Sequence, residues 1–171
     1  MSINFTAIFI ALLLIVGQSS ADETRITAST ADEHAQSTSA WSDRAEELVF
    51  HALAFIDVQY KYGGKSPDTG WDCSGYVRHV FKEAIGVVLP RNAVSMSSEG
   101  APVSRGELQP GDLVFFNTLK HAFSHVGIYL GENRFIHAPT TGKAVQISNM
   151  TTQYWARRYN GGRRIVIAQQ P

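Results

Sequence analysis

The sequence contains one cysteine, Cys73, which stands in the segment Trp71-Asp72-Cys73-Ser74-Gly75. A lone thiol has no partner for an intramolecular disulfide, so it serves either as a small buried side chain or as a reagent. As a thiolate, cysteine attacks the carbonyl carbon of an amide and forms a covalent acyl-enzyme. The polar flanks and the nearby glycine favour this nucleophilic chemistry over a structural thiol.

A helix is predicted to begin at Cys73. The apolar residues between Tyr76 and Ile85 form a stripe with helical periodicity, and Gly86 supplies a typical C-terminal stop. Asp72 is the predicted N-cap, which places Cys73 in the first turn, beside unpaired backbone N–H groups and the positive end of the helix dipole. This setting predicts a pKa for Cys73 below the value of about 8.5 for a free cysteine.

A cysteine nucleophile needs a base within hydrogen-bonding distance, and the base needs a group that orients its ring. His125 and His137 stand on two β-rich runs that are joined by Gly131-Glu132-Asn133. Alternation places His125, Gly127 and Tyr129 on one face of the first run. Neighbouring antiparallel strands can bring the two histidines together. One would then act as the base, while the other accepts its Nδ1 proton.

The other four histidines are weaker candidates for the base. His34 lies in a polar N-terminal segment, and His51 lies within the apolar sequence of the first predicted helix. His79 follows Cys73 by six residues and faces another side of the helix. His121 is predicted to lie in a loop between strands.

The order of the predicted elements indicates an α+β protein. The first helix is expected to begin near Trp41, where Asp43 and Glu46 resemble a capping box, and a short helix is expected within residues 92–99. Five β-rich runs follow, and most of their connections are too short for crossover helices. We therefore predict N-terminal helices packed on a mainly antiparallel sheet. The runs cover residues 113–116, 126–130, 134–137, 144–147 and 164–167, the last one after a predicted turn at Gly161-Gly162.

The N-terminal part of the chain has the pattern of an export signal. An unbroken apolar run from Ile8 to Val16 precedes small residues that end at Ala21, so residues 1–21 are predicted to be a cleaved signal peptide. The run is too short to span a bilayer, and an uncleaved anchor is the alternative. Residues 22–40 are polar and are expected to form a flexible tether. Residues 41–171 have the length of one domain.

Composition excludes several classes of function. Fifteen basic and fifteen acidic side chains give a formal net charge of zero, which argues against nucleic acid as the main partner. The chain lacks an HExxH motif, and its single cysteine leaves any zinc site short of the usual thiolates. No metal or other cofactor is therefore expected.

Six motifs, taken in their order along the chain, resemble those of the NlpC/P60 cell-wall peptidases. They are Tyr60-Lys61-Tyr62-Gly63-Gly64, Asp72-Cys73-Ser74-Gly75, Leu89-Pro90-Arg91, Gly111-Asp112-Leu113-Val114-Phe115-Phe116, His125-Val126-Gly127-Ile128-Tyr129-Leu130-Gly131 and Phe135-Ile136-His137-Ala138. The likeness spans roughly residues 45–168. It implies a papain-like α+β fold and hydrolysis of peptidoglycan stem peptides, usually between the D-γ-glutamyl residue and the diamino acid.

The resemblance also implies catalytic roles. By position in the motifs, Cys73 would be the nucleophile, His125 the base and His137 the residue that orients the base. Tyr60 matches a tyrosine whose hydroxyl supports the oxyanion site. The mechanism would be that of a cysteine peptidase with an acyl-enzyme intermediate.

Further expectations concern the substrate groove and the location of the protein. Asp72 and Ser74 match positions that line the groove, and the segment Lys65 to Trp71 is slightly longer than in short family members. The expected partner is the stem peptide itself, recognised by the catalytic domain or with the help of another protein. We expect an exported protein, in the bacterial periplasm, with no stable membrane insertion after signal cleavage.

Two alternatives keep the fold and change the function. One is an amidase or acyltransferase that acts on a different amide, including an antibacterial toxin. The other is a wall-binding module without catalytic activity. The joint presence of Cys73, His125 and His137 argues against the binding module, because a binder has no need for this set.

Overall fold

The computed structural model describes residues 41–66, 68–119 and 121–165. The predicted signal peptide (residues 1–21), the predicted tether (residues 22–40) and His34 lie outside the described residues. Within the described part, helices come first and a sheet follows, which confirms the α+β prediction. None of the helices in these three ranges is long and apolar enough to cross a membrane.

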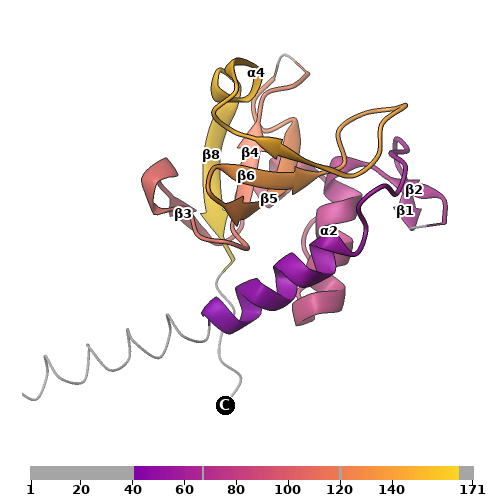
Figure 1. Ribbon diagram of the computed structural model, residues 1–171, viewed down its shortest axis with the longest axis horizontal. Coiled ribbons are helices and arrows are strands. Elements are labelled where there is room, and N and C mark those ends of the chain that lie inside the picture. The colour runs from indigo at the N-terminus through magenta and orange to yellow at the C-terminus, as the bar shows by residue number, and fades with distance from the viewer. Residues whose placement is uncertain (1–40, 67, 120, 166–171) are drawn as a thin grey trace, which may run out of the picture. The chain divides into compact units, whose positions relative to one another are not determined.

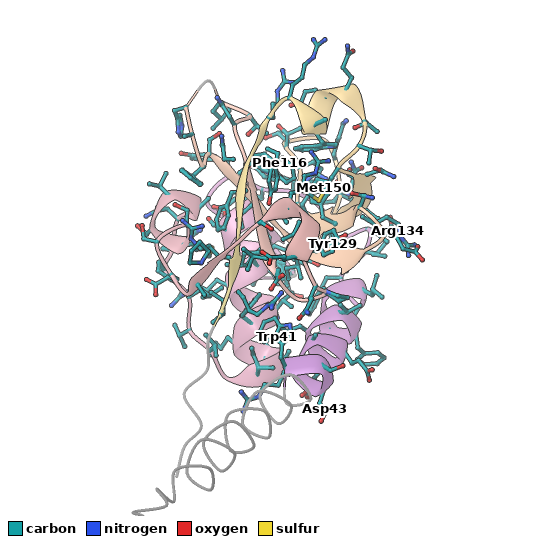
Figure 2. The ribbon with its side chains drawn as sticks, turned by 90° about the vertical axis from the view of Figure 1, so that its left-hand side faces the viewer. Trp41, Asp43, Phe116, Tyr129, Arg134 and Met150 are labelled. Atoms are coloured by element: carbon teal, nitrogen blue, oxygen red, sulfur yellow. The ribbon has the colours of Figure 1, made fainter. Side chains whose placement is uncertain are left out.

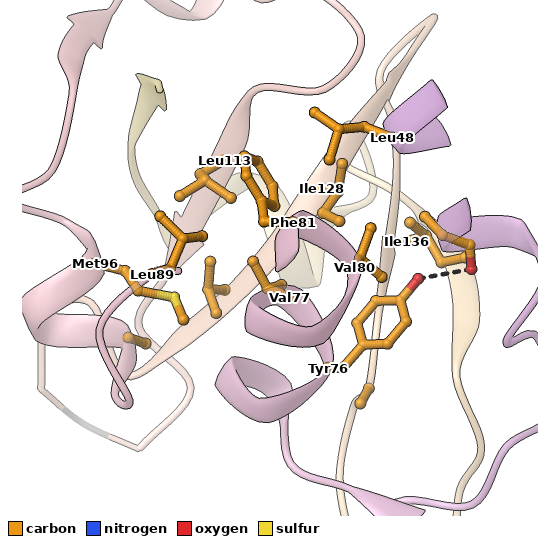
Figure 3. Close-up of a cluster of buried hydrophobic side chains, with 14 of the residues drawn as sticks. Leu48, Tyr76, Val77, Val80, Phe81, Leu89, Met96, Leu113, Ile128 and Ile136 are labelled. Atoms are coloured by element: carbon orange, nitrogen blue, oxygen red, sulfur yellow. Dashed lines mark hydrogen bonds between the residues drawn. The ribbon is translucent and has the colours of Figure 1, made fainter. Parts of the chain in front are cut away.

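The described chain begins in a helix that covers residues 41–53. Asp43 is not its N-cap, contrary to the prediction, because the backbone is already helical at Trp41. Leu48 and Ala52 of this helix are fully buried. The hydroxyl of Tyr76 donates a hydrogen bond of 2.9 Å to the carbonyl of Ala52, which ties the helix to its neighbour α2 (Figure 3).

Helix α2 covers Cys73–Ile85, with the start and the end that the sequence predicts. The carboxylate of Asp72 accepts a hydrogen bond of 2.7 Å from the backbone N–H of Gly75 and so caps the first turn. Gly86 ends the helix with a φ of 71°, a left-handed conformation that glycine adopts without a steric penalty. Together these caps fix the position of Cys73 at the start of the helix.

Within the described ranges, six antiparallel strands form the main sheet, in the order β3-β8-β4-β5-β6-β7. Their bounds are β3 Ala101–Val103, β4 Leu113–Phe116, β5 His125–Gly131, β6 Arg134–His137, β7 Gln146–Asn149 and β8 Tyr159–Arg164. The prediction of a mainly antiparallel sheet is confirmed. The short elements are the hairpin of β1 (Lys65–Ser66) and β2 (Gly70–Trp71), α3 (Ala93–Met96), the 3₁₀ turn η1 (Arg105–Glu107) and α4 (Gln153–Ala156).

The last two strands differ from the prediction. Strand β7 begins two residues later than expected, and β8 covers Tyr159–Arg164, so Gly161-Gly162 lies inside a strand and forms no turn. A Cβ at Gly162 would lie 2.7 Å from Cδ2 of Leu108. The glycine is therefore explained by close packing against Leu108 and not by a change of chain direction.

Apolar side chains cover both faces of the sheet, because successive residues of a strand point to opposite sides. Helix 41–53 and α2 lie on one side of the sheet (Figure 1), where their apolar side chains meet those of β4 to β6 (Figure 3). The cluster on the other face consists of Val114, Phe116, Tyr129, Phe135 and Met150, part of which is labelled in Figure 2. Burial on both faces makes β5 and β6 firm supports for the side chains at their ends.

Candidate active site

Cys73 is the first residue of α2, and it is half-buried. Backbone N–H groups of Val126, Ser74 and Cys73 itself act on its sulfur and favour the thiolate. Val126 belongs to β5 and directly follows His125. The fold therefore brings the thiol to the strand that carries the predicted base.

The pKa of Cys73 is raised, which is the opposite of the direction predicted from the helix start. Burial raises the pKa of the thiol to about 11, and the negative charge of Asp72 acts in the same direction. These effects outweigh the backbone N–H groups, which lower the pKa. The sequence prediction was wrong because the first turn is covered by the rest of the fold and because its N-cap is an anion.

The structure brings His125 and His137 into direct contact. Nε2 of His125 and Nδ1 of His137 share a hydrogen bond of 2.8 Å, and the two rings are perpendicular, with centroids 4.9 Å apart. The nitrogen of His125 that faces His137 is thus Nε2 and not Nδ1, the nitrogen expected from the sequence. Nδ1 of His125 is the nitrogen that remains for Cys73, although no hydrogen bond joins the two residues in the described structure.

Both imidazoles are buried, His125 with 3% and His137 with 0% of its surface exposed. Burial lowers the pKa of His125 to about 4. Burial, together with the neighbouring His125 and the charge of Lys143, lowers the pKa of His137 well below its usual value. At neutral pH the pair is uncharged, so one nitrogen of each ring carries a lone pair.

Aromatic side chains enclose the two imidazoles. The Trp155 ring stacks on His125 at 5.6 Å with an interplanar angle of 26°, and it meets His137 edge-on at 5.0 Å. Phe116 packs near His125, and Phe135 packs against His137 at 4.7 Å. Trp155 comes from α4, in the connection between β7 and β8, and nothing in the sequence pattern linked it to the histidines.

Gly127 creates the space that the pair requires. A Cβ at this position would lie 2.7 Å from Cδ2 of Phe135, 2.8 Å from the carbonyl oxygen of Ile136 and 3.2 Å from Cβ of His137. Real Cβ atoms almost never approach backbone oxygen this closely. Any larger side chain would therefore push β6, and His137 with it, away from β5.

We expect Gly127→Ala to lower the free energy of unfolding by about 1–3 kcal/mol, because the added methyl group forces a shift in a packed core. Gly106→Ala is the matched control, since a Cβ there would have no neighbour within 4 Å among the residues that the structure describes. Urea unfolding of both variants measures the difference. A Gly127→Ala midpoint equal to that of Gly106→Ala would contradict the packing argument.

Asp72 and Ser74 flank the nucleophile and are both held by Arg91. The guanidinium forms a bidentate pair with Asp72, with distances of 3.0 Å and 2.6 Å, and donates a hydrogen bond of 3.0 Å to Oγ of Ser74. Burial opposes ionisation of Asp72, but hydrogen bonds from Arg91, Gly75 and Ser74 outweigh it and lower the pKa of the carboxyl. Arg91 belongs to the motif Leu89-Pro90-Arg91, but this contact with Asp72 and Ser74 was not predicted from the sequence.

Tyr60 forms an isolated β-bridge with Trp71, two residues before the nucleophile. Burial raises the pKa of its phenol, and the charges of ionised Cys73 and Asp72 raise it further. The backbone N–H of Tyr60 donates to the carbonyl of Lys143, in the connection between β6 and β7. The phenol is thus anchored close to the thiol and stays protonated at neutral pH.

The other described histidines take no part in this site. His79 packs against Trp71 and Phe55, with ring centroids 4.5 Å and 5.1 Å away. His51 meets Phe50 edge-on in the first helix. His121 is exposed in the loop between β4 and β5.

A raised thiol pKa has a direct consequence for alkylation. With a pKa of about 11, Cys73 stays protonated at neutral pH, and iodoacetamide reacts with the thiolate. We expect the folded protein to react more slowly than the same protein in urea at neutral pH, with a rate that climbs as the pH approaches 11. Faster reaction of the folded protein at mildly acidic pH, lost in His125→Ala, would instead indicate a thiolate–imidazolium pair.

A model of the NlpC/P60 family matches residues 57–164, which is more than half of the chain and includes every residue of this site. The chain therefore belongs to the NlpC/P60 family. A solved NlpC/P60 family protein from Bacillus cereus aligns with a TM-score of 0.67 and 32% identity, over 72% of this chain and 40% of that one.

Two curated relatives differ in the activity that their names state. The murein DD-endopeptidase MepH of Escherichia coli K12 is 44% identical over 65% of this chain and 42% of its own length. The gamma-DL-glutamyl hydrolase of Bacillus subtilis is 43% identical over 68% of this chain and 28% of its own length. The chain thus aligns with less than half of either relative.

Proposed function

We propose that this chain is a peptidoglycan hydrolase that cleaves an amide bond of the stem peptide through an acyl-enzyme on Cys73. The observation that carries the proposal is the placement of Cys73 at the start of α2, beside β5, next to a buried pair of histidines joined at 2.8 Å. Two observations support peptidoglycan as the substrate class. The chain belongs to the NlpC/P60 family, and its relatives are named as a murein endopeptidase and a glutamyl hydrolase.

In the proposed mechanism His125 acts as the base through Nδ1. The resting pair is uncharged, so Nδ1 takes the proton while Sγ of Cys73 attacks the carbonyl carbon. The oxyanion that develops would be held by backbone N–H groups at the start of α2 and by the protonated phenol of Tyr60. The charge separation begins with the attack and ends when His125 passes the proton on.

His125 passes the proton on in the later steps of the reaction. His125 protonates the leaving amine and then activates the water that hydrolyses the acyl-enzyme. His137 holds Nε2 of His125 throughout, and Trp155 keeps bulk water from the two rings. The imidazolium that forms during each step is stabilised by its hydrogen bond to His137.

The groove is proposed to run past Asp72 and Ser74, which flank the nucleophile. Arg91, Gly75, Ser74 and Gly63 already donate hydrogen bonds to the carboxylate of Asp72. Oγ of Ser74, which Arg91 holds in place, keeps one lone pair that can accept a hydrogen bond from a substrate N–H group. Because Arg91 also neutralises Asp72, this part of the groove carries little net charge. It would therefore select the substrate by hydrogen-bond geometry more than by charge.

For the bond itself, we propose the link between D-γ-glutamate and the diamino acid, and the DD-endopeptidase relative favours the D-alanyl cross-link as the second candidate. Two purified muropeptides separate them. A γ-DL enzyme shortens the stem of an uncross-linked monomer, whereas a DD enzyme leaves that monomer intact and splits a cross-linked dimer. Mass spectra that show neither substrate changed would contradict the proposed function.

We further propose that residues 1–21 direct export to the bacterial periplasm, that residues 22–40 form a tether, and that residues 41–171 form the catalytic domain. The apolar run of the N-terminal segment and the location of peptidoglycan outside the cytoplasm support this arrangement. The N-terminal sequence of protein recovered from a periplasmic extract tests it. A chain that retains residues 1–21 there would contradict cleavage.

A further inference from the structure

The hydrogen bonds of the histidine pair continue beyond His137. Nε2 of His137 lies 3.0 Å from Oγ of Ser148, on the edge strand β7. Strand β7 pairs with β6 in a register that sets Ser148 opposite Phe135, two residues before His137. An unbroken chain of hydrogen bonds therefore runs from Nε2 of His125 through both nitrogens of His137 to a hydroxyl.

The direction of this chain decides which nitrogen of His125 carries a proton. If Ser148 donates to Nε2 of His137, then His137 is protonated on Nδ1 and donates to His125. His125 would then carry its own proton on Nδ1, so that no lone pair remains for the thiol. If Ser148 accepts instead, every bond reverses and Nδ1 of His125 presents its lone pair.

Only the second direction suits both states of the base. As an imidazolium, His125 has protons on both nitrogens, so Nδ1 of His137 must accept a hydrogen bond from Nε2. The proton of His137 must then stay on Nε2, where Ser148 is its partner. The opposite arrangement would set two N–H groups against each other at 2.8 Å during the reaction.

We propose that Ser148 is a positioning residue that accepts a hydrogen bond from Nε2 of His137 and thereby holds both histidines as Nε2–H tautomers. Nδ1 of His125 then keeps its lone pair for Cys73. The inference rests on the function proposed above for the use of that lone pair, but the tautomers themselves are a property of the resting protein.

The surroundings of Ser148 suit an acceptor. Its side chain is half-buried and lines a cavity of about 390 Å³ together with Trp155 and Lys143. A serine hydroxyl has one proton and two lone pairs, so it can donate into this cavity while a lone pair serves His137. The ammonium group of Lys143 has no lone pair and cannot replace it.

The tautomers can be measured directly on the full chain. In protein labelled with ¹⁵N in its histidine rings, protonated and unprotonated nitrogens have distinct chemical shifts. We expect His125 and His137 both to be protonated on Nε2 and unprotonated on Nδ1 at neutral pH. In Ser148→Ala we expect signals of the Nδ1–H tautomer to appear for both rings.

Kinetics on a stem-peptide substrate give an independent readout. We expect Ser148→Ala to lower kcat by about 3- to 10-fold, the factor that corresponds to one neutral hydrogen bond, with little change in KM. Ser148→Thr keeps a hydroxyl and should restore both the tautomers and kcat. Ile147→Ala, on the same strand, is the control for a general effect on β7.

The outcomes distinguish this inference from the proposed function. A wild-type His137 protonated on Nδ1, or a Ser148→Ala protein with unchanged tautomers, would overturn the role of Ser148. If Ser148→Ala fails to fold, the wild-type spectrum and Ser148→Thr still decide. Absence of hydrolysis by the wild type, with the expected tautomers, would overturn the proposed function and leave the positioning intact.

Discussion

Cys73→Ser is expected to reduce muropeptide hydrolysis on the order of 10⁴-fold or more while leaving the fold unchanged. The two side chains are nearly isosteric, but a hydroxyl is far less acidic than a thiol. The pKa of His125 is lowered to about 4 by burial, so this imidazole is a weak base that cannot activate an alcohol efficiently. Release of shortened muropeptides, followed by liquid chromatography, measures the loss.

The control for this variant is its thermal unfolding, which should match that of the wild type because the substitution leaves no cavity. A folded Cys73→Ser protein that still digests muropeptides at a rate close to that of the wild type would contradict the cysteine-peptidase mechanism. A variant with lost activity and lost stability would point to a structural role for the thiol.

The second large effect concerns the two histidines. His125→Ala is expected to lower the rate by about 10²–10⁴-fold, since it removes the general base. His137→Ala should cost less, because a base without its partner still samples the productive tautomer. The initial rates of both variants on one muropeptide test this order.

His121→Ala is the matched control for the histidine variants, because His121 is exposed in a loop and lies outside the site. It should retain the activity of the wild type. Normal activity in His125→Ala combined with a loss in His121→Ala would overturn the assignment of the base.

The elements that hold the nucleophile were predictable because their signals are local. The N-cap at Asp72, the apolar stripe of α2 and the stop at Gly86 follow one another within a few turns of chain. The β-rich runs at 113–116 and 126–130 are apolar on both faces and flanked by turns, so strands were the natural prediction. Local pattern therefore gave the position of Cys73 and of the strand beside it.

The features that could not be predicted from the sequence depend on tertiary contacts. The pKa of Cys73 rises because of burial under segments distant in the sequence, and the choice of Nε2 in His125 depends on how the two imidazole rings meet. Ser148 and Trp155 come from later segments, the edge strand β7 beside β6 and helix α4, without any spacing that relates them to Cys73. The two glycines inside β8 were predicted to form a turn, because glycine is the typical residue both of turns and of closely packed strand positions.

Covalent labelling with a substrate analogue tests the central claim most directly. Stem peptides that end in a chloromethyl ketone, at either the D-γ-glutamyl or the D-alanyl position, place an electrophile where the scissile carbonyl would lie. With one of the two, peptide mapping of the full chain should find a single label, on Cys73, that an excess of unmodified stem peptide prevents. A label on another residue, or labelling of Cys73 that ignores the competitor, would contradict the account.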